Sequence, residues 1–332
     1  MNSVTRLMLT SNGSGLKRSG LDGFVVSLLP TFLRFVWGPL PSPPDLATYL
    51  AARSQTHGPG EHWSDFTDWR GYPRRECRRL AFHEFCEPFD VIELWFDKEP
   101  NEQLSLIWLI HYLRSYPEIA AKLKLRLVDF DLVTMLLDGP DELEDVPLVD
   151  LMAAEIETAC RCWEAFRAPT PEACFALLRS DLSTFPLLRP ALADLLAELP
   201  CGTTGLGATE MRLLELMANG YSHTNHLFYL RNLGQRRVFN DCELGYLLQN
   251  LSFGPKPAIE GLDGELRTLG RVHAAGRVEA FRRSELSLTE FGWQVLAYKD
   301  DFSGHNPIDR WWGGTRLTND NLWRWNSVLA KP

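Results

Sequence analysis

The stretch that decides the fold class is Val91-Ile-Glu-Leu-Trp-Phe96, followed at once by Asp97-Lys-Glu-Pro-Asn-Glu-Gln103 and then by the apolar segment Leu104–Leu113. The first six residues are mostly β-branched, aromatic or aliphatic, which predicts a buried strand. The segment from Leu104 is apolar on nearly every face at helical spacing, which predicts a helix buried all round. A buried strand that runs into a buried helix is typical of a parallel sheet covered on both faces.

Three further segments have the composition of strands: Arg6–Thr10 (RLMLT), Phe24–Leu29 (FVVSLL) and Leu125–Phe130 (LRLVDF). Helical stretches are expected between them, over 45–53 and 62–85. Strands that alternate with helices predict an α/β fold. We therefore expect a Rossmann-like domain with a parallel sheet in residues 1–137.

The rest of the chain predicts a different organisation. Residues 138–147 include five acids in eight residues (DGPDELED) and read as an acidic linker. Residues 148–200 predict a helical connector with helices near 148–167, 170–179 and 186–198. Residues 201–300 predict a winged-helix-like domain, from the order helix, helix, helix, strand-like pieces over 257–283, and helix. Residues 301–332 form a Trp-rich segment that we expect to dock back onto the body, because so much apolar surface is unfavourable in a loose tail.

The net charge is −9, from 34 Lys and Arg against 43 Asp and Glu. Such a surface repels phosphate backbones, which disfavours a nucleic-acid binder that uses the whole surface. Residues 206–284 carry ten basic and eight acidic side chains, and the expected reading helix, Asp241–Leu251, has no Lys or Arg. DNA binding through wing arginines is therefore an alternative behind a role in packing or partner docking. These arginines are Arg271, Arg277, Arg282 and Arg283.

The sequence predicts a cytoplasmic protein. Its seven cysteines include no C-x-x-C pair, which is simplest to explain as reduced thiols. The most apolar region, Val25–Leu40, is broken by Pro30, Arg34 and Pro39, whereas a bilayer span needs about 20 apolar residues. The N-terminal region also fits a signal peptide poorly, because Asp22 interrupts its apolar stretch.

Three places in the chain together resemble one known family. They are Leu9-Thr-Ser-Asn-Gly-Ser14, Leu94-Trp-Phe-Asp-Lys-Glu-Pro-Asn-Glu-Gln-Leu104, and Ile308-Asp-Arg-Trp-Trp-Gly-Gly314 with Leu322-Trp-Arg-Trp325. They look like the segments of an uncharacterised bacterial family catalogued as domain of unknown function 1835. The resemblance covers most of the chain, although the opening turn lacks the aspartate of the family's Gly-Asp-Ser. The family has no settled activity, so the resemblance implies an architecture and no mechanism.

The best candidate site lies where the expected strands end, because ligands of parallel sheets bind beyond the carboxyl ends of the strands. Asp97, Glu99 and Gln103 follow one strand. Asp129 and Asp131 come at the end of another. The turn after the first strand offers three polar side chains: Ser11, Asn12 and Ser14. Such oxygen ligands would suit Mg²⁺ or Ca²⁺, or a pair could do acid–base work. The competing interpretation is that Glu99 and Asn101 cap a helix and that the aspartates face solvent.

Other motifs are weaker. Gly13, Gly15 and Gly20 lack the dinucleotide spacing, and no lysine follows Gly20 as a P-loop requires, so a looser anion site is the most that this turn predicts. His223 and His226 are two ligands without a third, which does not make a zinc site.

The terminal Trp-rich segment offers a second candidate. Asp309, Arg310 and Arg324 could hold a base or sugar ring over the tryptophans, with interdomain packing as the alternative.

From the sequence we expect a regulatory or binding protein with a small polar ligand at the strand ends. The first alternative is an enzyme that acts on a phosphorylated or nucleotide-like substrate, with or without the help of Mg²⁺. The second is a DNA-binding transcriptional regulator. No motif identifies a cofactor, a metal site, a membrane partner or an oligomeric state.

Overall fold

The structure is a computed structural model, and it describes residues 5–11, 16, 21–27, 34–51, 62–66, 77, 79–130, 132, 143, 145–228, 238–263 and 275–332. The chain divides into two compact units. Unit 1 consists of Met1–Phe35, Leu40–Arg167 and Arg179–Ala191, and unit 2 of Val36–Pro39, Ala168–Leu178 and Leu192–Pro332.

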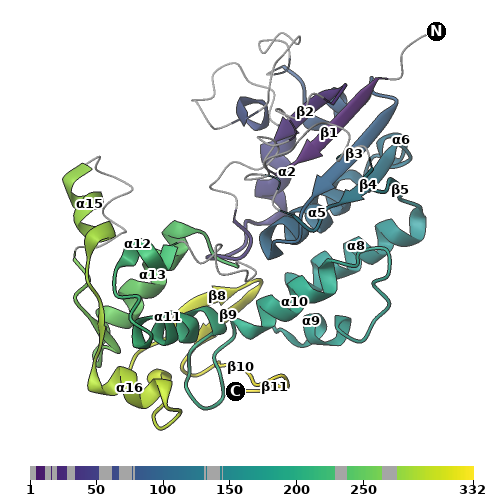
Figure 1. The fold of residues 1–332 in the computed structure, drawn as a ribbon. Coiled ribbons are helices and arrows are strands. Elements are labelled where there is room, and N and C mark those ends of the chain that lie inside the picture. Colours follow the sequence, from purple (N-terminus) through teal and green to yellow (C-terminus); the bar gives the residue numbers. More distant parts are fainter. Residues whose placement is uncertain are drawn as a thin grey trace. The chain divides into compact units, whose positions relative to one another are not determined.

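Unit 1 is built on a mostly parallel five-stranded sheet (Figure 1). Its strands are β1 (Arg6–Thr10), β2 (Phe24–Ser27), β3 (Val91–Phe96), β4 (Leu123–Leu127) and β5 (Val149–Asp150). They lie in the order β2-β1-β3-β4-β5, and only β5 runs antiparallel to its neighbour. The expectation of an α/β fold with a parallel sheet is confirmed. From β1 the chain first adds β2 on one side and then β3 on the other, so the strand order reverses between β1 and β3.

Helices connect and cover these strands. The bounds are α2 (Pro43–Ala51), the 3-10 turn η1 (Trp63–Phe66), α4 (Phe82–Cys86), α5 (Pro100–Leu113), α6 (Pro117–Ala120), α8 (Ala153–Phe166) and α10 (Leu188–Ala197), the last of which continues into unit 2. The expectation of one helix over 62–85 is wrong, because Ala81 has extended backbone angles and α4 begins only after it.

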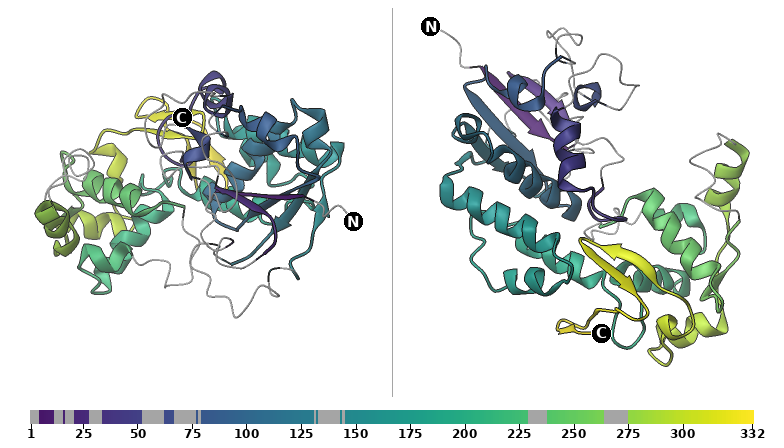
Figure 2. Two further views of the ribbon diagram at one scale, coloured as in Figure 1. Left: turned by 90° about the horizontal axis from the view of Figure 1, so that it is seen from above. Right: turned by 180° about the vertical axis from the view of Figure 1, so that it is seen from behind.

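α5 is buried on nearly all sides, as its apolar sequence predicts. It lies between the sheet and α8 (Figures 1 and 2). Phe35 packs between the two helices, with ring centroids 5.4 Å from Trp108 of α5 and 5.0 Å from Trp163 of α8. This burial fixes the start of α5 against the strand ends.

On the face of the sheet away from α5, a charged side chain is buried in the core. Glu93 of β3 is 2% exposed and accepts hydrogen bonds from Trp95 Nε1 at 2.9 Å and Arg126 Nε at 3.1 Å. The Arg126 guanidinium lies 5.0 Å from the centre of the Trp95 ring, and Arg6 Nη1 is 3.6 Å from the Glu93 carboxylate. A buried carboxylate needs such partners, because an unpaired charge in a low-dielectric interior is strongly destabilising.

Unit 2 is mainly helical. Its helices are α9 (Glu172–Leu177), α11 (Ala208–Ala218), α12 (Thr224–Phe228), α13 (Asp241–Ser252), α15 (Ala275–Arg283), α16 (Glu290–Leu296) and the 3-10 turn η3 (Phe302–Gly304). Its short strands are β6 (Ile259–Glu260), β7 (Ser287–Leu288), β8 (Asp309–Trp312), β9 (Thr315–Thr318), β10 (Arg324–Trp325) and β11 (Leu329–Ala330). They form three antiparallel pairs, β6 with β7, β8 with β9, and β10 with β11.

The expectation of strand-like pieces up to residue 283 is wrong for Ala275–Arg283, which forms α15. The Glu279–Arg283 ion pair, 2.6 Å across one helical turn, favours that helix. The residues that follow α15 are extended and pair with two other segments of unit 2. Glu285 forms an antiparallel bridge with His223, and β7 pairs with β6.

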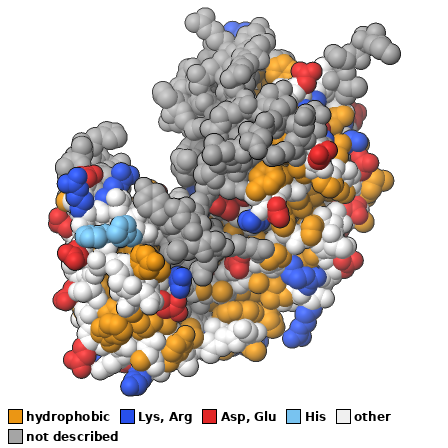
Figure 3. Space-filling model, in the orientation of Figure 1, with side chains coloured by type: hydrophobic (Ala, Val, Ile, Leu, Met, Phe, Trp, Pro, Cys, Tyr) orange, Lys and Arg blue, Asp and Glu red, His pale blue; other side chains and the backbone are white. Residues whose placement is uncertain are grey.

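On the face shown in Figure 3, acidic and basic side chains are interspersed over the described surface and do not gather into a basic stripe. None of the helices in the described parts of the chain is long and apolar enough to span a bilayer.

The turn after β6 requires a glycine. Gly261 has φ +94°, and a Cβ there would overlap the carbonyl oxygen of Glu285. Gly220 has a similar φ of +92°, but no neighbouring atom lies within 4 Å of the place where its Cβ would be. Substitutions at these two glycines therefore distinguish the cost of backbone strain alone from the added cost of steric overlap.

We expect Gly220→Ala to lower the free energy of unfolding by about 1–2 kcal/mol, through the left-handed backbone alone. Gly261→Ala should cost about 1–3 kcal/mol more, because the Glu285 backbone must move as well. Urea denaturation of both variants measures the difference. If both variants lost the same unfolding free energy, the close contact between residue 261 and the Glu285 backbone would be contradicted.

Candidate functional site

The candidate site lies at the carboxyl ends of β1 and β3, where the strand order of unit 1 reverses. Polar residues follow both strands, Ser11 after β1 and Asp97 after β3, and both are largely buried. In open α/β sheets this reversal leaves a crevice between the two strand ends, because the connections leave toward opposite sides. The position therefore marks the default ligand site of such a sheet.

Ser11 connects the end of β1 to the first turn of α5. Its hydroxyl donates a hydrogen bond to the Glu102 carboxylate, 91 residues further along the chain. Glu102 is absent from the site predicted by sequence. The available signal is that Glu102 is the only Asp, Glu, Lys or Arg in the α5 sequence.

Asp97 holds the loop between β3 and α5. Its side chain is buried, with Oδ1 accepting from the Glu99 amide at 2.9 Å and Oδ2 accepting from the Leu132 amide at 3.3 Å. Its own carbonyl accepts from Gln103 Nε2 at 2.5 Å. Asp97 and Gln103 are thus brought together, as predicted from their positions after the strand.

Glu99 occupies the N-cap position of α5, and Pro100 is the first helical residue. Asn101 lies inside the helix, where its Oδ1 accepts from the Phe35 amide at 2.9 Å. Asn101 therefore ties the segment after residue 34 to the start of α5 and does not cap the helix.

Two polar atoms at this site have no hydrogen-bond partner in the structure as described. They are Thr10 Oγ1, at the last residue of β1, and Gln103 Oε1, in the first turn of α5. Both residues are 0% exposed. Buried polar groups in folded proteins are nearly always hydrogen-bonded, so each orphan of this kind requires an explanation.

The carboxyl group of Glu102 is electrostatically perturbed. Burial, together with the charges of Asp97 and Glu99, raises the pKa of Glu102 to about 8, while the Ser11 hydrogen bond and the Arg34 charge act in the opposite direction. The group is therefore largely protonated at neutral pH and can donate a hydrogen bond or a proton. Perturbed acids of this kind are concentrated at functional sites.

Some predicted residues do not join this group. Asn12, Ser14 and Asp131 lie outside the described residues, as does most of the acidic linker over 138–147. Asp129 is exposed. Within the described ranges, no three His, Cys, Asp or Glu side chains come together in a way that could hold a metal ion.

The Trp-rich segment places its three candidate residues in unit 2, each with an ionic partner. Arg310 donates to Glu210 Oε2 at 2.9 Å and to the Glu198 carbonyl at 3.3 Å. Asp309 forms a two-point ion pair with Arg316, both contacts at 2.9 Å. These contacts hold β8 against the body of unit 2 and against β9.

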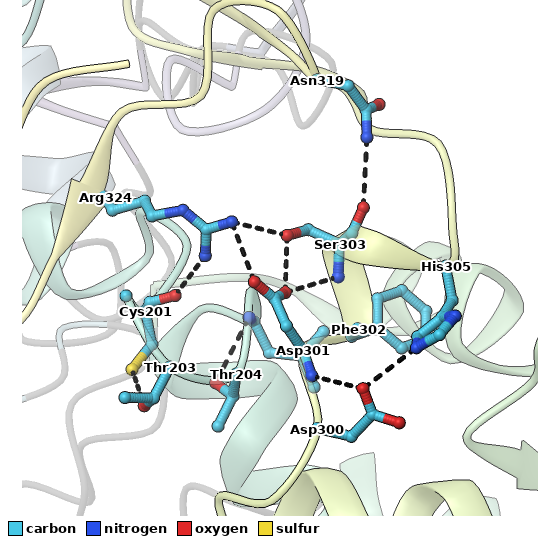
Figure 4. Close-up of polar contacts among 12 residues, drawn as sticks. Cys201, Thr203, Thr204, Asp300, Asp301, Phe302, Ser303, His305, Asn319 and Arg324 are labelled. Atoms are coloured by element: carbon cyan, nitrogen blue, oxygen red, sulfur yellow. Dashed lines mark hydrogen bonds and ion pairs between the residues drawn. The ribbon is translucent and has the colours of Figure 1, made fainter.

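Arg324 is the centre of a network within unit 2 (Figure 4). Its guanidinium donates to the Cys201 carbonyl at 2.9 Å, to Asp301 Oδ2 at 2.9 Å and to Ser303 Oγ at 2.8 Å. Asp301 Oδ1 accepts in turn from the backbone and hydroxyl of Ser303. The side chain thus joins the end of the chain to two other loops of unit 2.

No protein-family model matches the chain, and a search of the curated proteins gives no match. The resemblance to domain of unknown function 1835 therefore stays a prediction.

The pKa of Glu102 predicts how stability depends on pH. The folded state holds this proton more tightly than the unfolded state, where the pKa is near 4.5. The stabilisation is therefore complete below pH 4.5 and is lost as the pH rises through 8. Relative to Glu102→Gln, the wild type should lose about 1–3 kcal/mol of unfolding free energy between pH 5 and pH 8.

Urea denaturation at several pH values measures this loss. The control is Glu118→Gln, which alters an exposed acid of α6 and should run parallel to the wild type. If Glu102→Gln also ran parallel to the wild type, the proton would not reside on Glu102.

The two Arg–Asp pairs of the terminal segment form a matched comparison. Arg324 is 24% exposed and has three acceptors, whereas Arg316 is 57% exposed and contacts an exposed partner. Arg324→Met should cost about 1–3 kcal/mol, because it leaves charged and polar acceptors unpaired. Arg316→Met should cost less than about 1 kcal/mol. Chemical denaturation tests the difference, and equal costs would contradict the anchoring role of Arg324.

Proposed function

We propose that this chain is a regulatory binding protein whose unit 1, as a Rossmann-like domain, holds a small polar ligand at the carboxyl ends of β1 and β3. The observation that carries the proposal is the pair of orphaned buried atoms, Thr10 Oγ1 and Gln103 Oε1, at the point where the strand order reverses. An unsatisfied buried polar group destabilises the folded state by about 1–3 kcal/mol. A ligand that hydrogen-bonds to such an atom would remove that penalty.

The geometry around Gln103 supports the same proposal. Its amide nitrogen is held by the Asp97 carbonyl, which fixes the orientation of the side chain and leaves the oxygen as the free end. The Ser11–Glu102 hydrogen bond gives the neighbouring side chains a defined position before any ligand arrives. Preorganised groups of this kind favour binding, because little conformational entropy remains to be lost.

For unit 2 we propose a winged-helix-like arrangement over α11 to α16. The support is the helix order together with the pairing of residue 223 with 285 and of β7 with β6. A protein partner fits this unit better than DNA. Gln249 of α13 is only 7% exposed, and Asp241 and Glu243 occupy the first turn of the same helix. Base-reading helices instead present exposed polar side chains and cations.

A cytoplasmic location is part of the proposal. All seven cysteines lie in described parts of the chain and none forms a disulfide, and five of them are buried. Cysteines that form no disulfide suit a reducing compartment.

An enzyme is the second candidate, and the pKa of Glu102 is the observation that favours it. A carboxyl group with a pKa of about 8 can act as a general acid at neutral pH, and Asp97 and Glu99 are close enough to perturb it. Turnover of a bound compound that stops in Glu102→Gln, with binding retained, would favour this candidate over a purely regulatory role.

The ligand hypothesis predicts an unusual combination of effects. Thr10→Val removes an orphaned polar atom, so it should raise the stability of the unliganded protein by about 1 kcal/mol. Gln103→Met also removes one, but it takes the donor away from the Asp97 carbonyl as well, so it should leave the stability unchanged or lower it. Both should also diminish or abolish the stabilisation that a metabolite library produces in the wild type, since a bound ligand stabilises only the protein that binds it. Thermal unfolding with and without the library measures both effects.

Gln249→Met is the matched control. Gln249 is also a buried glutamine with an orphaned amide atom, but it lies in α13 of unit 2. This variant should keep the full response to the library. If Thr10→Val and Gln103→Met also kept it, or if no metabolite stabilised the wild type, the proposed site would be refuted.

A further inference from the structure

The orphaned atoms at the strand ends define what a ligand must supply. Gln103 Oε1 only accepts hydrogen bonds, and the bond from Gln103 Nε2 to the Asp97 carbonyl prevents the amide from turning over to present its donors. Thr10 Oγ1 can accept as well as donate. A ligand that satisfies Gln103 must therefore present at least one N–H or O–H donor to it.

The charges at the site act in the same direction. Asp97, Glu99 and Glu102 are close enough to one another to perturb the titration of Glu102, and Arg34 is the one cation that acts on the same group within the described parts of the chain. The described charges that act on Glu102 are thus mostly negative, and the excess is smaller when Glu102 is protonated. A phosphate brought here would meet like charges in a poorly screened environment, which is unfavourable.

A helix start normally favours anions, because its free amides and its dipole attract negative charge. At α5 two features weaken this attraction. Pro100 at the first helical position has no N–H to offer, and the Glu99 amide already donates to Asp97 Oδ1. The Asp97 carboxylate therefore lies beside the start of the helix, where its charge opposes the binding of an anion.

Resting on the function proposed above, we propose that the strand-end site takes a small neutral or cationic ligand rich in N–H or O–H donors, such as an amino sugar or a nucleoside, and discriminates against its phosphorylated form. Gln103 Oε1 accepts a hydrogen bond from the ligand. Asp97 and Glu99 supply the negative field that selects against phosphate.

The test uses two matched pairs of probes with the full chain: glucosamine against glucosamine 6-phosphate, and adenosine against adenosine 5′-monophosphate. Nuclear magnetic resonance of the Gln103 side-chain amide reports directly on the site, and its signals are assigned by their loss in Gln103→Met. Thermal unfolding gives the apparent affinity for wild type, Gln103→Met and Gln249→Met.

At least one unphosphorylated probe should shift the Gln103 amide signals and bind about tenfold more weakly to Gln103→Met, which corresponds to the loss of one hydrogen bond. Its phosphate ester should bind more weakly than the parent compound in the wild type, and Gln249→Met should bind both as the wild type does.

The two proposals fail in different ways. If a phosphate ester bound more tightly than its parent and moved the Gln103 signals, the ligand class would be overturned while the strand-end site stood. The class would also be overturned if none of the four probes moved those signals while an anionic library metabolite acted through Gln103. If every stabilising compound acted equally on wild type and Gln103→Met, the site and the proposed function would both be overturned.

Discussion

The structure of unit 1 depends on the parallel pairing of β3 beside β1. Main-chain hydrogen bonds set the register Leu9↔Leu94, so the two strands end at the same edge of the sheet. Because β2 occupies the other side of β1, the chain must leave these two ends in different directions. Parallel pairing over so long a connection has a large loop-closure cost, and the apolar faces of the strands and of α5 compensate for it. The same pairing makes the Ser11–Glu102 contact possible.

Two carboxyl groups of unit 1 are removed from solvent at this sheet, and their electrostatic surroundings differ. Glu93 lies in the middle of β3 and is matched by Arg126, Arg6 and the Trp95 ring nitrogen, so its charge is accommodated within the fold. Glu102 lies at the strand ends beside other acids and has the Ser11 hydroxyl as a neutral partner. Its pKa rises because desolvation and like charges both disfavour ionisation. The first carboxyl group stabilises the fold, whereas the second remains available for chemistry or binding.

Local pattern predicted the strands Arg6–Thr10 and Val91–Phe96 to the residue, because short, mostly apolar runs bounded by turn residues need little context. β4 begins and ends earlier than its expected span, since its limits are set by the register Ile92↔Leu123 with β3. α15 was expected to be extended, but these residues form a helix, which the pairing of Glu279 with Arg283 across one turn favours slightly. Asp97 and Gln103 could be anticipated from their place after a strand. Glu102 could not, because its partner Ser11 becomes a neighbour only through the sheet.

The sequence alone does not show which candidate polar residues are available to a ligand. The fold does, because it either supplies a hydrogen-bond partner for each polar group or leaves the group without one. Arg310 and Arg324 sit among tryptophans and look suited to a ring-shaped ligand, yet acceptors within unit 2 already engage both guanidinium groups. Thr10 and Gln103 look like ordinary ends of buried elements, yet each keeps a buried atom without a partner. An arginine with its acceptors in place is held by the fold and has less to offer a ligand. An oriented amide with an unused oxygen keeps an unmet interaction, which is what a ligand at the strand ends would supply.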